Sequence, residues 1–190
     1  MALTAALTAS LRAPSRSFAE AMLWALALSL VLVLSARISL PFWPVPMTMQ
    51  PLALLIVAGL AGPPLAVGAV AAYLLEGVAG LPVFAGTPAH GVGLAYMAGP
   101  TGGYLLAMLP AAWVAGQATR HLAQRPVALF AALCGAIAVI YAGGAAWLAL
   151  FVGVHQALVA GVLPFVAGDL VKAALACALL AAHRRRLQRA

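Results

Sequence analysis

Long uncharged runs constrain this chain more than any other feature of its sequence. Residues 38–75, 77–119 and 126–168 contain no Asp, Glu, Lys or Arg. Across all 190 residues, 66% are hydrophobic and only 7% are charged. A water-soluble domain of this size could not cover its apolar core with so few charges, so the sequence predicts an integral membrane protein.

Six apolar segments can form helices that cross a bilayer, which takes about 20 residues each, or somewhat fewer in short hairpins. The second and third segments meet at a tight turn, where Pro63 and Pro64 suit the first turn of a helix. We therefore predict an all-α membrane protein, a compact bundle of six transmembrane helices in one domain, 1–190. The helices are expected at about 18–38, 47–61, 63–79, 103–120, 127–151 and 164–183.

The arginines predict how this bundle is oriented. They precede the first helix (Arg12 and Arg16), separate the fourth from the fifth (120–125) and follow the sixth (184–189). Basic residues in short loops favour the cytoplasmic side, and a count through six helices puts all three groups there; Arg37 is the exception. Both termini are therefore predicted to be cytoplasmic, in a multi-pass protein of the cell inner (plasma) membrane. The net charge of +7 is thus explained by the lipid bilayer and not by nucleic acid.

Asp169 and Lys172 are two charges inside the last predicted helix. The chain has only three carboxylates, and Lys172 is its only lysine. Ionisable groups inside a membrane helix are costly, so they form a functional-site hypothesis by default. At positions i and i+3 they share one helix face and could offer a planar polar ligand an acceptor beside a donor. An internal salt bridge that merely joins two helices is the alternative.

Three connections are predicted to face outward, at about 39–46, 80–102 and 152–163. The first is rich in proline and the second in glycine and proline, and the second is long enough to form a lid or an ordinary solvated connection. Asp169 precedes the predicted inner boundary near His183 by about 21 Å of helix. The charged pair is therefore expected in the outer half of the membrane, beneath these connections.

Other polar and aromatic residues are weaker candidates for the same site. Glu76, near the outer end of the third helix, either reaches the outer interface or contributes to the site. Trp43, beside the first outward connection, is the best candidate for stacking on a ligand, and Tyr73 and Tyr96 share that possibility.

Ala21, Ala25 and Ser29 form a ridge of small residues on the first helix. Such ridges let helices approach closely, so this one could serve internal packing or the docking of a partner helix. The sequence lacks the phosphate-binding loop, the H-E-x-x-H zinc motif and the G-x-S-x-G nucleophile motif. We therefore expect no catalytic residue, no metal and no cofactor.

Four motifs follow one another along the chain. They are Pro-Val-Pro-Met-Thr-Met-Gln at 44–50, Gly-Leu-Pro-Val-Phe-Ala-Gly at 80–86, Gly-Pro-Thr-Gly-Gly-Tyr at 99–104 and Gly-Asp-Leu-Val-Lys at 168–172. In this order they resemble BioY, the biotin-specific substrate-binding component of energy-coupling factor (ECF) transporters. The third and fourth motifs are the most specific.

The resemblance implies high-affinity binding of biotin from the outer face, transport into the cell and no enzymatic activity. It implies a transmembrane coupling protein and two cytoplasmic ATPases as partners, with the ridge on the first helix at the coupling-protein contact; a homo-oligomer is also open. Biotin would be the substrate and not a cofactor. The expected substrate-binding residues are Gln50, Trp43, Tyr73, Glu76, Phe84, Tyr96, Gly99, Thr101, Gly102, Asp169 and Lys172.

In this interpretation an ionised Asp169 accepts hydrogen bonds from the ureido N–H groups of biotin. Lys172 donates to the ureido oxygen or to the carboxylate. No arginine lies between Arg37 and Arg120, so no arginine of this region can hold the carboxylate. The alternatives are an ECF component for another vitamin, an intramembrane enzyme that acts on lipid with Glu76 and Asp169 as acid and base, and a structural subunit that binds no small molecule.

Overall fold

The computed structural model describes residues 17–40, 44–87, 89 and 91–189. Within these ranges the chain is almost entirely helical, which confirms the all-α part of the predicted fold. The helices are α2 (Phe18–Arg37), α3 (Gln50–Ala61), α4 (Pro63–Val78), α5 (Gly93–Met97), α6 (Gly102–Leu122), α7 (Pro126–Val152), α8 (Val154–Gly161) and α9 (Leu163–Arg189). A two-stranded antiparallel ribbon, β1 (Ser39–Leu40) with β2 (Met47–Thr48), precedes α3.

Each predicted helix has a counterpart, and two ends differ from the expectation by three residues or more. α3 begins at Gln50 and not at 47, because Met47 and Thr48 are extended and pair with β1. α9 continues to Arg189 and not to 183. Arginines are good helix formers and their charge is favourable at a helix C-terminus, so they prolong the helix. The short helices α5 and α8 lie within the second and third predicted connections.

Local sequence signals explain where several helices begin. Ser17 and Glu20 form a capping box at the start of α2, each side chain accepting a hydrogen bond from the other residue's backbone N–H. Pro63 and Pro126 stand in the first turns of α4 and α7. Gly62, with φ of 82°, makes the turn between α3 and α4 in a conformation that favours glycine.

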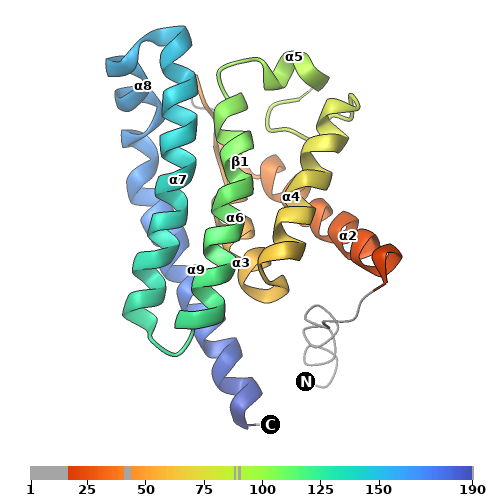
Figure 1. The fold of residues 1–190 in the computed structure, drawn as a ribbon. Coiled ribbons are helices and arrows are strands. Elements are labelled where there is room, and N and C mark those ends of the chain that lie inside the picture. The colour runs from red at the N-terminus through yellow and green to blue at the C-terminus, as the bar shows by residue number, and fades with distance from the viewer. Residues whose placement is uncertain (1–16, 41–43, 88, 90, 190) are drawn as a thin grey trace.

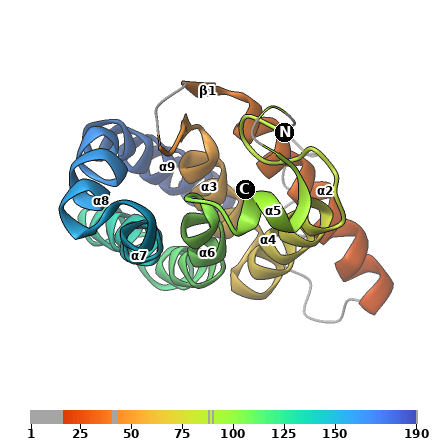
Figure 2. The ribbon, with the colours of Figure 1, turned by 90° about the horizontal axis from the view of Figure 1, so that it is seen from above.

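α6, α7 and α9 run along the long axis of the bundle, whereas the N-terminal part of α2 leans away from it (Figures 1 and 2). α6 and α7 approach most closely where glycines face the neighbouring helix. A Cβ added to Gly143 would lie 2.7 Å from the Ala107 Cβ, and one added to Gly144 would overlap the Tyr104 ring. These glycines set how close α6 lies to α7 and therefore where Tyr104 lies.

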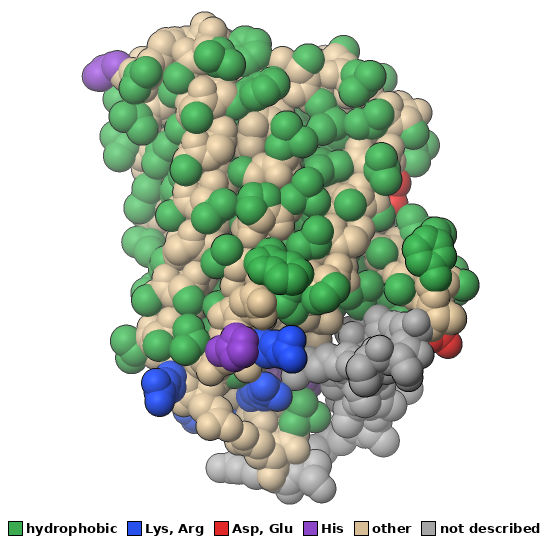
Figure 3. All heavy atoms as spheres, viewed as in Figure 1, with side chains coloured by type: hydrophobic (Ala, Val, Ile, Leu, Met, Phe, Trp, Pro, Cys, Tyr) green, Lys and Arg blue, Asp and Glu red, His purple; other side chains and the backbone are tan. Residues whose placement is uncertain are grey.

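Among the described residues, three helices are long and apolar enough to cross a membrane: Phe18–Arg37, Pro126–Val152 and the Leu163–Gln188 part of α9. α3 and α4 are shorter apolar helices. Figure 3 shows a mostly apolar face, with basic side chains gathered at the end of the bundle where α6 meets α7 and α9 ends. α5 and α8 lie at the opposite end (Figure 1).

Arg37 departs from this pattern and has a structural role of its own. Its guanidinium donates hydrogen bonds to Thr87 O at 3.1 Å and to Pro82 O. Both carbonyls belong to the connection that follows α4. Arg37 therefore ties that connection to the C-terminal end of α2.

Candidate functional site

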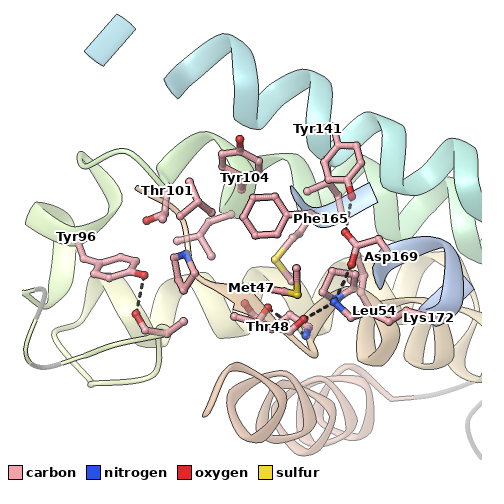
Figure 4. A pocket seen from close by; sticks show the side chains of 18 residues that line it. Met47, Thr48, Leu54, Tyr96, Thr101, Tyr104, Tyr141, Phe165, Asp169 and Lys172 are labelled. Atoms are coloured by element: carbon pink, nitrogen blue, oxygen red, sulfur yellow. Dashed lines mark hydrogen bonds and ion pairs between the residues drawn. The ribbon is translucent and has the colours of Figure 1, made fainter. Parts of the chain in front are cut away.

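A cavity of about 90 Å³ lies inside the bundle between α3, α6, α7 and α9. Its two ends are polar and its middle is apolar (Figure 4). Its described lining residues are Val45, Pro46, Met47, Thr48, Gln50, Pro51, Leu54, Ala85, Tyr96, Thr101, Tyr104, Leu105, Met108, Ile140, Tyr141, Phe165, Asp169 and Lys172.

At one end Asp169 and Lys172 form a buried ion pair. Lys172 Nζ lies 2.7 Å from Asp169 Oδ1, and the two residues are only 8% and 5% exposed. Their spacing on α9 puts both side chains on the helix face that meets the cavity. Since breaking a buried pair leaves an uncompensated charge, each group depends on the other.

Two further groups complete this polar end. The Tyr141 hydroxyl, from α7, donates a hydrogen bond of 2.7 Å to Asp169 Oδ2. Lys172 Nζ also donates one of 2.7 Å to Thr48 O, a backbone carbonyl of β2. Pairing with β1 fixes that carbonyl, because Thr48 is opposite Ser39 in the ribbon. The ion pair thus joins α9 to α7 and to the segment that leads into α3.

The opposite end of the cavity contains Tyr96 and Thr101 (Figure 4). Tyr96 stacks on Phe84 with ring centroids 5.0 Å apart, and its hydroxyl donates to Ala85 O at 2.7 Å. Burial raises the pKa of Tyr96, so its phenol stays neutral and keeps donating. Phe84 also meets Tyr73 edge to face at 5.4 Å. This aromatic row holds the connection between α4 and α5 against the cavity.

The structure brings five of the predicted binding residues to the cavity and places others behind its wall. Those at the cavity are Gln50, Tyr96, Thr101, Asp169 and Lys172. Tyr73 is fully buried behind Gln50, whose Nε2 donates to the Tyr73 hydroxyl at 2.8 Å. Phe84 is fully buried in the aromatic row. For both residues, direct contact with a ligand stays a prediction.

Gly99 and Gly102 support the same end of the cavity through their backbone. Gly99 O accepts a hydrogen bond of 2.9 Å from Trp147 Nε1. A Cβ on Gly102 would overlap Met97 O, so only glycine fits there without a shift. These two positions shape the start of α6 and thereby the place of Thr101.

Glu76 and the ridge on the first helix lie away from the cavity. Ser29 Oγ is 2.6 Å from Glu76 Oε1, across the contact between α2 and α4. Ala25 faces α4 as well, because a Cβ on Gly68 would be 3.7 Å from the Ala25 Cβ. The ridge therefore meets α4 at Ala25 and Ser29, and Ala21 and Ala25 also face an open groove between α2 and α4. Trp43 lies outside the described residues.

Sequence reasoning missed several residues of the cavity. Tyr141 could have been suspected, because a tyrosine inside an apolar helix usually needs a hydrogen-bond partner for its hydroxyl. The Thr48 carbonyl could not have been suspected, because every residue has a backbone carbonyl and none of them leaves a pattern in the sequence. Met47, Tyr104 and Phe165 line the apolar middle, where any apolar residue of the sequence was an equal candidate.

Nothing in the described part of the chain forms a metal centre. No group of three or more His, Cys, Asp or Glu side chains comes together there. The cavity instead offers a neutral, elongated space with charge-assisted hydrogen-bonding groups at one end.

Comparison with known proteins agrees with the motifs. The model of the BioY family matches residues 4–189. A Pyrococcus horikoshii protein named "Probable biotin transporter BioY" is 40% identical over 74% of this chain and 82% of its own length. The "Biotin transporter BioY" of Thermotoga maritima is 35% identical over 83% of this chain and 91% of its own.

The fold has a counterpart among solved structures. It matches the crystal structure of the S-component for biotin from an ECF-type ABC transporter with a TM-score of 0.75. The match covers 90% of this chain and 95% of that one, at 22% sequence identity. The comparisons confirm the resemblance seen in the motifs: the chain belongs to the BioY family.

Proposed function

We propose that this chain binds biotin from the outer face of the plasma membrane and mediates its uptake as the substrate-binding subunit of an ECF transporter. The family match and the names of its relatives support this function. The observation that carries it at the level of atoms is the buried Asp169–Lys172 pair at one end of an apolar cavity.

The end of the cavity that holds Asp169 and Lys172 has the hydrogen-bond donors and acceptors that a cyclic urea requires. An ammonium group has three N–H donors, and Lys172 uses two of them on Asp169 and Thr48. One donor is left for the ureido oxygen. Each oxygen of the Asp169 carboxylate accepts one hydrogen bond in the structure and has a further lone pair free. These lone pairs can receive the two ureido N–H groups.

The rest of the cavity sets the orientation of the ligand. Met47 and Phe165 form an apolar middle that accommodates the sulfur-containing ring and the aliphatic tail. Thr101 lies at the far end, next to the first turn of α6, where the helix dipole favours a negative charge. We therefore place the biotin carboxylate near Thr101 and the ureido ring at Lys172.

The size of the cavity implies movement during binding. Pockets for ligands of drug-like size measure roughly 300–1,000 Å³, and this cavity measures about 90 Å³. The lining must therefore shift to admit a bicyclic ligand with its tail. Two parts of the lining lie outside the bundle helices: the connection that carries Ala85 and Tyr96, and residues 45–48 before α3. Met47 and Thr48 are held by pairing with β1, so we assign the movement to the connection.

In this proposal α2, α6, α7 and α9 and the two shorter helices α3 and α4 all cross the membrane. The basic end of the bundle is then cytoplasmic, because arginines favour that side. We also place both termini on the cytoplasmic side, where the ATPases would act through a coupling protein. Asp169 lies about 22 Å along α9 from Arg184, in the outer half.

Equilibrium binding of radiolabelled biotin to the purified chain tests the function. We expect saturable binding that unlabelled biotin displaces and that thiamine and riboflavin do not. Displacement by either of those vitamins would indicate another substrate. Absence of any saturable binding would overturn the proposal.

Biotin methyl ester tests the orientation. Lys172→Gln should lower the affinities for biotin and for its methyl ester by the same factor, because the two ligands have the same ureido ring. Thr101→Val should weaken biotin but leave the ester nearly unaffected. The reverse pattern would place the carboxylate at Lys172.

A further inference from the structure

A second hollow, a groove of about 1020 Å³, runs between α2 and α4 and is separate from the cavity. Gly68, Ala71 and Ala72 of α4 form one wall. The other wall is formed by α2, with the ridge residues Ala21 and Ala25 beside Met22 and Leu26. Because the residues on α4 are so small, the groove is open along the helix. Its volume equals the upper end of the range for ligand pockets, roughly 300–1,000 Å³.

The groove has opposite charges at its two ends. Arg120, in the last turn of α6, and Arg184, near the end of α9, line one end. Glu76 lines the other end, where Ser29 holds its carboxylate. An anionic group would therefore be attracted to the arginines and repelled from Glu76.

The two arginines have no anion of their own in the described part of the chain. The one ion pair there joins Lys172 to Asp169, so neither Arg120 nor Arg184 meets a carboxylate. Arg120 is exposed and Arg184 half-buried. A guanidinium binds a phosphate group through two parallel hydrogen bonds, so this pair suits a phosphodiester.

We propose that this groove binds an anionic phospholipid, with its phosphate on Arg120 and Arg184 and an acyl chain along the walls of α2 and α4. The arginines lie at the basic end of the bundle, and anionic head groups are concentrated at the cytoplasmic surface of a membrane. The apolar walls continue from that end into the depth of the hydrocarbon. A helix of another protein could cover the walls, but without acidic side chains it would leave both guanidiniums unpaired.

Native mass spectrometry of the purified full-length chain tests the proposal. Phosphatidylglycerol and phosphatidylcholine with the same acyl chains are titrated separately. We expect phosphatidylglycerol to bind preferentially. The double variant Arg120→Gln/Arg184→Gln should weaken it about tenfold or more, since hydrogen bonds to charged groups are lost.

A matched double variant, Arg185→Gln/Arg186→Gln, removes the same charge from exposed residues that do not line the groove. It should lower the affinity for phosphatidylglycerol by less than about threefold, because exposed charges are screened by salt. Equal losses in the two double variants would overturn the proposal and indicate general attraction to the basic end. Equal binding of the two lipids by the unaltered chain would overturn it too.

The apolar walls are tested by filling the groove. Ala72→Phe should displace phosphatidylglycerol, whereas Ala131→Phe, at an exposed position on α7 outside the groove, should not. Biotin binding by each variant serves as the check on folding. If the coupling protein binds the groove and phosphatidylglycerol does not, the proposal is wrong.

Discussion

The cavity and the groove both contain charged groups beside apolar walls, but the charges are paired in the cavity and lack a described carboxylate partner at the basic end of the groove. In the cavity, Asp169 and Lys172 are buried and neutralise each other, with Tyr141 and Thr48 as additional partners. In the groove, Arg120 and Arg184 are at least partly exposed and have no described carboxylate partner. Pairing fixes the direction of each polar atom in the cavity.

This difference indicates what each hollow can recognise. Fixed donors and acceptors in a closed space select a small ligand by its hydrogen-bonding pattern. The partly exposed guanidinium groups of Arg120 and Arg184, beside an apolar wall, select only for a ligand with a negative charge and an apolar chain. Substitutions in the cavity should therefore lower biotin affinity strongly, and substitutions along the groove should change biotin affinity weakly or not at all.

The largest effect is expected when the buried ion pair is broken. Lys172→Gln leaves the Asp169 carboxylate buried without its cation, which costs about 3–5 kcal/mol. We expect biotin affinity to fall by about a hundredfold or more, with a lower thermal unfolding midpoint in detergent.

The double variant Asp169→Asn/Lys172→Gln separates stability from recognition. It removes both charges, so the unfolding midpoint should recover toward that of the unaltered chain. Biotin affinity should stay low, because both charged partners of the ureido ring are gone. Affinity equal to that of the unaltered chain would contradict the site.

The next largest effect concerns the wall that positions Tyr104. Gly144→Ala places a Cβ inside the Tyr104 ring, and overpacking of this kind costs about 1–3 kcal/mol. Gly135→Ala, in the same helix, meets nothing within 4 Å. We expect Gly144→Ala to lower both the unfolding midpoint and biotin affinity.

Gly135→Ala serves as the matched control for helix propensity. Alanine is favoured over glycine in a helix, so this variant should unfold at the same temperature or higher. A similar loss of stability in both variants would show that close packing at Gly144 is not the cause.

Tyr141→Phe should have a smaller effect, confined to the charged end of the cavity. It removes one hydrogen bond to the Asp169 carboxylate and leaves the ion pair with Lys172 in place. We expect biotin affinity to fall about tenfold. Tyr104→Phe removes a hydrogen bond to Gly161 O outside the charged end, so it should change affinity less. Equal effects would mean that Tyr141 does not position Asp169.

Most of the fold could be predicted, because long apolar runs without charge can form little else but helices in a membrane. The differences arose where local pairing overrode the apolar pattern. Nothing in the sequence pattern separates Met47 and Thr48 from the helix that follows, but they pair with Leu40 and Ser39, which lie seven and nine positions earlier in the chain. Sequence patterns do not reveal such a contact.

The candidate site could be predicted only in its charged part. Asp169 and Lys172 stand out because ionisable groups are rare and costly within membrane helices. Thr48 contributes a backbone carbonyl, which any residue has, and its position follows from the fold alone. Glu76 carries the same sequence signal as Asp169, but the packing of α2 on α4 turns it toward Ser29 and the groove.

The smallest effect is expected at the contact between α2 and α4. Ser29→Ala removes the hydroxyl that lies 2.6 Å from Glu76, and hydrogen bonds between membrane helices average about 0.6 kcal/mol. Ser35→Ala is the matched control, since Ser35 is also buried in α2 and its hydroxyl donates to Leu32 O of the same helix. The unfolding midpoint should fall slightly more for Ser29→Ala, whereas biotin affinity should be unchanged in both. A tenfold loss of affinity in Ser29→Ala alone would show that the groove and the cavity are coupled, and the two hollows could then no longer be treated as independent sites.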